Sequence, residues 1–325
     1  DSIVSGGDNN TLVGTNAGTA ITTGDNNVAV GYNSLIANTT ASANTALGDN
    51  SLRDNTTGAS NTAVGHASLL NNTTASNNTA VGYYSLLANT TGIENLAAGF
   101  NALNDNTTAS YNTALGSQSM GLNTTGHSNT ATGNSSLYAN TTGVQNTAFG
   151  RSALEANTTA SENTAMGFES LKANTTGGSN TGIGEAALRG NTTANNNTGI
   201  GRQALYTNTS GANNTAVGKA ALFANTTANN NTAVGYASLT ANTTGASNTA
   251  VGNLALADNT TGQYNTSLGF EAGAGNTTGS ENVHIGYRAG YHNLAHTTGS
   301  RCVIIGAFAD VTTAGATDAQ VIGQD

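Results

Sequence analysis

The residue types that most often bind metals or catalyse reactions are few in this 325-residue sequence, which has five histidines and one cysteine. His284, His292 and His296 lie near one end, and the His292-x-x-x-His296 spacing could bring two imidazoles to one metal ion. No helix or strand pattern surrounds that pair, so we expect no metal site. Cys302 stands alone, which excludes an internal disulfide, and we interpret it as a small buried thiol.

Other residues that could carry chemistry also form no catalytic pattern. Acidic residues are scattered singly, and no serine, histidine and acid recur together as a triad requires. Glycine pairs such as Gly182 and Gly184 end short apolar segments, without the strand, loop and helix that cradle a phosphate. Asparagine occupies the polar positions where a calcium-binding β-roll has repeated aspartate. We predict that the protein is not an enzyme and uses no cofactor.

Aromatic residues are the strongest candidates for binding. Seven of them directly follow a recurrent glycine, and exposed rings at such regular spacing can stack on sugar rings. They are Tyr32, Tyr83, Phe100, Phe168, Tyr236, Phe270 and Tyr287. The alternative interpretation is that these rings cover a turn or a seam between subunits.

The elements that must position these residues are set by an internal repeat. Its anchor is the glycine that ends each NTAVG-like segment, and it recurs from Gly14 to Gly286 in sixteen steps of 17 residues. After one step of 20 it returns at Gly306, and after another 17 at Gly323. Positions are numbered below from the anchor glycine as 0 to 16. Repeats cover essentially the whole chain, which is typical of a stacked array rather than of two globular domains.

The positions within a repeat predict strands and exclude an amphipathic helix. Position 16 is nearly always apolar, position 4 is mostly leucine, and position 3 is small. Residues alternate along the segment that ends at the anchor, with no apolar stripe of helical period. The sequence therefore predicts an all-β parallel β-solenoid of about nineteen 17-residue coils, each with two or three short strands.

Charge placement indicates which positions face solvent. All nineteen charged residues between Gly14 and Ala289 fall at positions 1, 2, 5, 6, 11 or 12. Isolated charges avoid packed interiors, so we expect these six positions to be exposed and the other eleven covered. Positions 4 and 16, such as Leu171 and Met166, would then form the core. Position 15, as in Ala165, is almost uniformly small, and we interpret it as an outward row packed against another chain.

The asparagine of each NTT segment is expected to form a ladder. It recurs at position 7, from Asn38 through Asn55 and Asn72 to Asn276. Stacked amides can hydrogen-bond to the coils above and below, as they do in cross-β ladders. The same N-x-T pattern is also a glycosylation acceptor in a eukaryotic secretory route, and that alternative stays open.

The C-terminal coils depart from the regular pattern. We predict a regular solenoid over 1–286 and irregular coils over 287–325 that act as a cap or junction. The long step places the extra segment 294–296 inside an NTT turn, where it should bulge outward. In these coils the small row becomes His284, Ile304 and Val321, which we interpret as a more apolar contact between subunits.

Composition excludes several classes of function. The net charge of −9 leaves no basic stripe for nucleic acid, and no apolar run is long enough to cross a membrane. Charged residues make up 8% of the chain, and there is no proline. Asp1 begins partway through a repeat, so we expect a processed chain or a segment of a longer one.

The NTAVGxxSL pattern resembles the head repeats of trimeric autotransporter adhesins, and the longer NTAVG…NTTG form resembles repeats of phage tail fibres. The resemblance spans nearly the whole chain, although the adhesin repeat is shorter than 17 residues. It implies a left-handed β-roll assembled as a homotrimer, outside the cell, on a cell surface or on a virion. The expected function is a structural fibre or an adhesive head or spacer. Expected partners are further copies of the chain and a host-surface glycan or protein receptor.

Ice binding is the alternative function that the sequence leaves open. Threonines recur at position 8 in Thr39, Thr56, Thr73, Thr90, Thr107 and Thr124. On a solenoid such a row would repeat about every 4.8 Å, the spacing of paired strands. A flat, exposed threonine row of this kind is how several antifreeze proteins meet ice.

Overall fold

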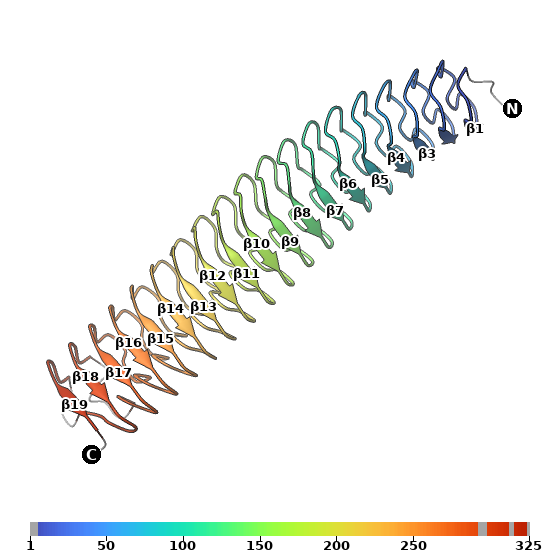
Figure 1. Cartoon of the computed structure of the whole chain (residues 1–325). Coiled ribbons are helices and arrows are strands. Elements are labelled where there is room, and N and C mark those ends of the chain that lie inside the picture. The colour runs from blue at the N-terminus through green and yellow to red at the C-terminus, as the bar shows by residue number, and fades with distance from the viewer. Residues whose placement is uncertain (1–5, 292–297, 312–314, 324–325) are drawn as a thin grey trace. The chain divides into compact units, whose positions relative to one another are not determined.

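The computed structural model describes residues 6–291, 298–311 and 315–323. The chain divides into two compact units, 1–162 and 163–325. Within each unit the chain winds as an all-β parallel solenoid (Figure 1), in which each coil supplies one strand of three residues. The predicted boundary near residue 286 stays a prediction.

The strands recur at the same three positions of successive coils, 14 to 16. The first unit contains β1 (Thr11–Val13), β2 (Val28–Val30), β3 (Thr45–Leu47), β4 (Thr62–Val64), β5 (Thr79–Val81), β6 (Leu96–Ala98), β7 (Thr113–Leu115), β8 (Thr130–Thr132) and β9 (Thr147–Phe149). The second contains β10 (Thr164–Met166), β11 (Thr181–Ile183), β12 (Thr198–Ile200), β13 (Thr215–Val217), β14 (Thr232–Val234), β15 (Thr249–Val251), β16 (Thr266–Leu268), β17 (Val283–Ile285), β18 (Val303–Ile305) and β19 (Gln320–Ile322).

Neighbouring coils are held in register by backbone hydrogen bonds. Ala63 of β4 lies opposite Ala80 of β5, one repeat along the chain. Bonds also join coils away from the strands: Leu69 N donates to Ser85 O at 3.0 Å and Asn77 N donates to Ala59 O at 3.1 Å. Backbone hydrogen bonds therefore join successive coils at the turns as well as along the strands, although each coil contains only one strand.

Two or three strands per coil were predicted, and the described residues contain one. The rest of the coil is built from turns in which positions 2, 4 and 12 adopt a left-handed backbone; Tyr84, Leu86 and Glu94 have φ of 55°, 52° and 55°. This conformation is disfavoured for L-residues and breaks a strand. Among the described residues, none with positive φ is valine, isoleucine or threonine, as expected from the poor fit of β-branched residues to this region.

This backbone predicts an unusual sensitivity at position 4. Leu86→Ile should lower the free energy of unfolding by about 1–2 kcal/mol more than Leu86→Met, because a β-branched residue fits poorly at φ 52°. Methionine already occupies the same position in Met120, at φ 48°. Urea denaturation followed by circular dichroism measures the difference. Equal destabilisation by the two substitutions would contradict the assigned backbone.

The interior of the coil is filled from positions 3, 4, 7, 10, 13 and 15. Leucine at position 4 is fully buried, as predicted for Leu171. The prediction for the strand was wrong: Ala165 is fully buried, whereas Met166 is exposed. The coil is thin: a Cβ added at Gly182, on the strand of the same coil, would lie 3.3 Å from Leu171 Cγ, so the strand has room only for a small residue there. Position 15 is small because of the chain's own core and not because of another chain.

Buried asparagines supply most of the polar interior. The predicted ladder at position 7 is confirmed: Asn72 Nδ2 donates to Asn55 Oδ1 at 2.8 Å and to Ala75 O at 2.9 Å. A second buried row lies at position 13, where Asn78 Oδ1 accepts from the backbone N of Asn95 at 3.0 Å. Amide side chains suit these rows because each one both donates and accepts, so the buried groups satisfy one another.

The terminal coils exchange large and small residues between the two sides of the core. At position 4, Gly18 and Gly290 replace leucine with φ of 60° and 65°. A Cβ added at Gly18 would meet Leu12, and one added at Gly290 would meet His284. Where position 4 loses its side chain, position 15 becomes large and fills the same space.

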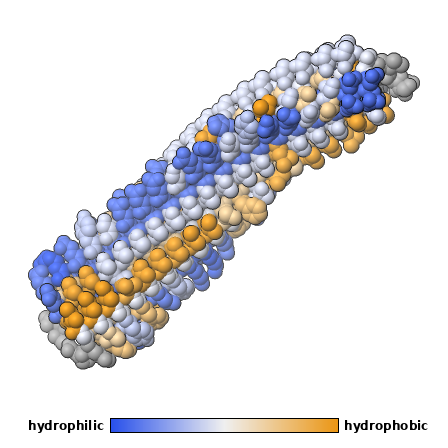
Figure 2. All heavy atoms as spheres, viewed as in Figure 1, coloured by the Kyte–Doolittle hydropathy of each residue, from blue (hydrophilic) through white to orange (hydrophobic). Residues whose placement is uncertain are grey.

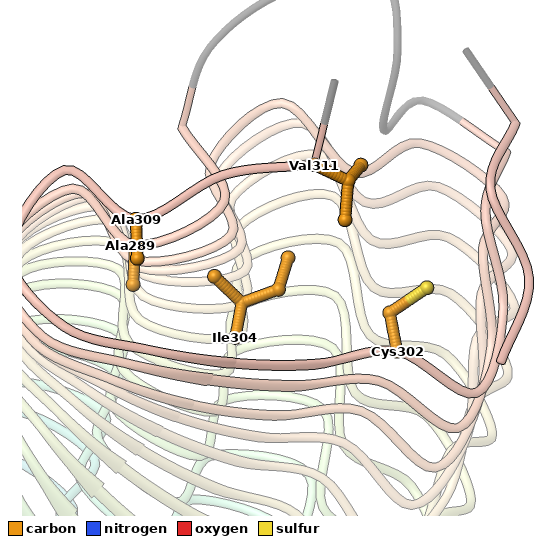
Figure 3. Close-up of a cluster of buried hydrophobic side chains, with 5 residues drawn as sticks. All are labelled: Ala289, Cys302, Ile304, Ala309 and Val311. Atoms are coloured by element: carbon orange, nitrogen blue, oxygen red, sulfur yellow. The ribbon is translucent and has the colours of Figure 1, made fainter. Parts of the chain in front are cut away.

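Figure 3 shows the result in the last coils, where Cys302 and Ile304 are directed into the enclosed interior with Ala289, Ala309 and Val311. His284 and Ile304 are fully buried, so the predicted apolar contact between subunits at these two residues is wrong. Cys302 is a buried free thiol, as predicted. The predicted bulge at 294–296 lies outside the described residues.

Candidate functional site

The surface feature that recurs in every described coil is the outward side of the strands, which we call the strand face (positions 14 and 16). Position 14 is mostly threonine and position 16 mostly valine, leucine or isoleucine. The apolar side chains are strongly exposed: Leu47 by 47%, Val81 by 41% and Phe149 by 56%. Figure 2 shows the corresponding band of hydrophobic atoms over the strands of the second unit. Sequence reasoning missed this surface because it placed position 16 in the core.

The strand face carries no charge in the strands that the structure describes. The nearest charges follow the anchor glycine, as Asp49 and Arg202 do. The six charge-bearing positions do lie largely at the surface, as predicted, although Glu271 is buried beside Arg288. The prediction that all eleven other positions are covered was wrong, because position 16 and the threonine at position 9 are exposed.

The seven predicted aromatic residues are all exposed. The structure brings some of them together: Tyr83 and Phe100 stack with ring centres 5.7 Å apart, and His66 stacks on Tyr83 at 5.2 Å. Tyr84 belongs to the same group, because its ring centre lies 4.0 Å from that of Tyr83. Stacking along a row covers ring faces, so only the outer faces at the ends of a stack are available to a ligand.

A second stack lies in the second unit. Phe270 and Tyr287 lie 5.3 Å apart and nearly parallel. The Cζ atom of Arg288 lies 5.4 Å from the centre of the Tyr287 ring. The Nε of Arg288 donates a hydrogen bond to Glu271 Oε2 at 2.6 Å. This hydrogen bond raises the pKa of Arg288, so the guanidinium is charged at every practical pH. Cation–π contact and ion pairing fix these rings in place. Tyr236, another of the seven, lies beneath Lys219, whose Nζ is 5.5 Å from the ring centre.

One carboxylate at position 2 joins two cations. Glu169 accepts from Lys172 Nζ and from Arg189 Nε, each at 2.7 Å. The hydrogen bond from Lys172 has the largest effect on Glu169, followed by that from Arg189, and both lower the pKa of its carboxyl group. Arg189 also donates to Tyr206 Oη at 3.3 Å, and Tyr206 stacks on Phe223. A carboxylate occupied by two cations is a structural link between coils and does not suit a general acid.

The predicted threonine row at position 8 is tied into the coil stack. Thr56 Oγ1 donates to Thr73 O at 3.0 Å, and Thr124 Oγ1 donates to Thr141 O at 2.9 Å. The other members make the same bond, and the row is only partly exposed. Its hydroxyl hydrogens are therefore committed within the protein.

Two hollows lie on the turns of the first unit. One, of about 310 Å³, is lined by Thr108, Ala109, Ser110, Tyr111, Thr125 and His127. The other, of about 70 Å³, is lined by Asn101, Asn104, Asp105, Gln118, Gly121, Leu122 and Tyr138. We call the second the Gly121 hollow; one of its lining residues, Asn101, has a buried side-chain oxygen that accepts no hydrogen bond from the described residues.

The next feature concerns side chains that could together hold a metal ion in the part of the chain that is described. Residues 6–291, 298–311 and 315–323 contain no group of three histidine, cysteine, aspartate or glutamate side chains placed to hold an ion. His284 is buried, and its Nδ1 lies 3.0 Å from Ser267 Oγ, within hydrogen-bond distance. His292 and His296 are outside the described residues. The described residues also contain no helix suited to spanning a membrane.

Comparison with known proteins gives no match among protein-family models, curated proteins or solved structures. Functional inference therefore depends on the strand face, the aromatic stacks and the hollows themselves.

Proposed function

We propose that this chain is an extracellular structural fibre or adhesive spacer that assembles with copies of itself through the strand face. The observation that supports the proposal most directly is the row of exposed apolar side chains at position 16. Contiguous apolar surface of this kind usually marks an interface. Burial of such a surface is favourable by roughly 25 cal/mol per Å².

A copy of the same chain is the partner that fits best. Its strand face has the same repeat along the coil axis, about 4.8 Å per coil, so apolar and threonine rows can match over many coils. The face is uncharged, so the net charge of −9 does not place acids opposite acids there. A homotrimer is the assembly that the resemblance to adhesin heads implies, and an exterior location follows from the same resemblance.

The assembly is tested by placing charges on the strand face. We expect the wild-type chain to show a mass of three chains by size exclusion with multi-angle light scattering. The triple variant Leu47→Glu, Val81→Glu and Phe149→Glu should show the mass of one chain, because burying three unpaired carboxylates is prohibitive. Its circular dichroism should stay that of a folded solenoid, since all three side chains point outward.

The matched control is Thr57→Glu, Thr91→Glu and Thr142→Glu, which adds the same charge at exposed position 9. This control should assemble as the wild type does. A wild-type monomer would contradict the proposal. If that monomer also showed thermal hysteresis and the strand-face variant lost it, ice binding would replace assembly as the better interpretation, with the threonines of position 14 as its residues.

A further inference from the structure

We propose that the Gly121 hollow binds one saccharide ring. This binding site is separate from the proposed assembly surface, since the hollow lies on the turns and not on the strand face. The lining residues come from three successive coils, at positions 2, 5 and 6. Asparagine, glutamine and aspartate side chains meet one tyrosine there, the combination of polar and apolar groups that sugar rings require.

A single missing side chain creates the hollow. Position 5 carries a side chain in the other coils of the first unit, for example Leu87, Asn104 and Glu155, but here it is Gly121. A Cβ added at Gly121 would lie 2.9 Å from the Tyr138 ring, so that ring leans over the gap left by the glycine. The hollow therefore has an aromatic wall and polar neighbours.

The polar groups around the hollow are short of partners. Asn101 Oδ1 is buried, and no described residue donates a hydrogen bond to it. The half-buried Asp105 carboxylate has no ion pair or hydrogen bond among the described residues. A buried acceptor without a donor is rare in folded proteins and is commonly satisfied by a ligand or water. The half-buried Asp105 is therefore the acceptor on this lining that a donor-rich ligand could reach.

The backbone that carries these groups is already fixed. Asn101 N donates to Tyr83 O at 3.0 Å, Gln118 N donates to Phe100 O at 2.8 Å, and Asp105 N donates to Gly121 O at 3.1 Å. Asn104 Nδ2 donates to Tyr84 O at 3.0 Å, which orients its amide. A ligand would not have to order this site, so little affinity would be lost to entropy.

Sugar chemistry matches this set of groups better than a cation does. Hydroxyls on adjacent carbons can donate to the two oxygens of Asp105 while accepting from an amide, and the C–H face of a pyranose packs on an aromatic ring. Calcium prefers six to eight oxygens, usually with several carboxylates, and the hollow offers one carboxylate. A volume of about 70 Å³ exceeds the 10–15 Å³ that one water needs, so it can admit part of a sugar ring.

Saturation-transfer NMR with methyl α-glucoside, methyl β-galactoside, methyl α-mannoside and methyl N-acetyl-β-glucosaminide tests the proposal on the full chain. We expect at least one glycoside to bind with millimolar affinity and to receive saturation through its ring protons. Asp105→Asn should weaken that binding about tenfold or more, because it removes a charged hydrogen-bond acceptor. Tyr138→Ala and Gly121→Leu should abolish it, the first by removing the wall and the second by filling the gap.

The matched control is Asp258→Asn, at the same position 6 in a coil that does not line the Gly121 hollow; it should bind like the wild type. Thermal unfolding of each variant separates loss of the site from loss of the fold. Three results would overturn the proposal: no saturation of any of the four glycosides, equal binding by wild type and folded Asp105→Asn, or loss of binding with EDTA, which would indicate a cation site.

Discussion

Ala80→Glu is expected to unfold the coils around β5, whereas Val81→Glu, one residue later, should leave them folded. Ala80 is fully buried and lies between Ala63 and Ala97 of the neighbouring strands. A carboxylate there would have no partner and would collide with the leucines of position 4. We expect a loss of about 4 kcal/mol or more in the free energy of unfolding.

The two variants carry the same added charge on adjacent residues, so each is the control for the other. Circular dichroism and the urea midpoint measure folding, and limited proteolysis locates any opened coil. If Ala80→Glu were tolerated while Val81→Glu unfolded the chain, the interior and exterior of the strand would be exchanged. The assignment of the strand face as a surface for assembly would then fail with it.

Much of the fold could be predicted because the repeat constrains it. The 17-residue step fixed the coil, and nineteen charges at six positions marked most of the solvent side. The buried Leu171 and the ladder through Asn72 were predicted from the residue type at a constant position. Repetition converts weak preferences into strong ones, because each position is sampled in many coils.

The two sides of the strand were not predicted correctly, and the reason is steric. Uniformly small residues such as Ala165 suit a tight interface and a thin core equally well. The residues of the end coils do distinguish these two interpretations of position 15. Gly18 occurs with Leu12, and Gly290 with His284 and Ile304, so positions 4 and 15 exchange volume. Such complementary exchange is expected only if both positions fill the same interior.

The Gly121 hollow was not predictable from the repeat. Seven aromatic residues were singled out because they follow an anchor glycine, and Phe100 does lie next to Asn101 of the hollow. The hollow itself depends on one glycine at position 5 and on the direction that Tyr138 takes from the next coil. The gap at Gly121 is visible in the sequence, but the side-chain direction is a property of packing alone.

Asn78→Asp, an isosteric change in the second asparagine row, is expected to destabilise the fold strongly. Asn78 Nδ2 donates to Gly92 O at 2.8 Å, and Asn78 Oδ1 accepts from Asn95 N at 3.0 Å. The substitution keeps the acceptor but replaces the donor by a charged oxygen that faces a carbonyl. At neutral pH we expect a loss of about 3 kcal/mol or more in the free energy of unfolding. Asn77→Asp, at the exposed neighbouring position, should change it by less than about 0.5 kcal/mol.

The pH dependence distinguishes a lost donor from a simple packing defect. Burial beside a carbonyl disfavours the charged form, so the folded-state pKa of the introduced carboxyl should lie above its unfolded value of about 3.9. The folded variant then binds the proton more tightly than the unfolded one does. Its stability relative to wild type is greatest below pH of about 4, where the protonated oxygen can again donate to Gly92 O, and falls as the pH rises through the folded-state pKa. Urea midpoints of variant and wild type at several pH values measure this. A deficit that stayed constant from acid to neutral pH would show that hydrogen-bond donation along this row does not hold the coils together.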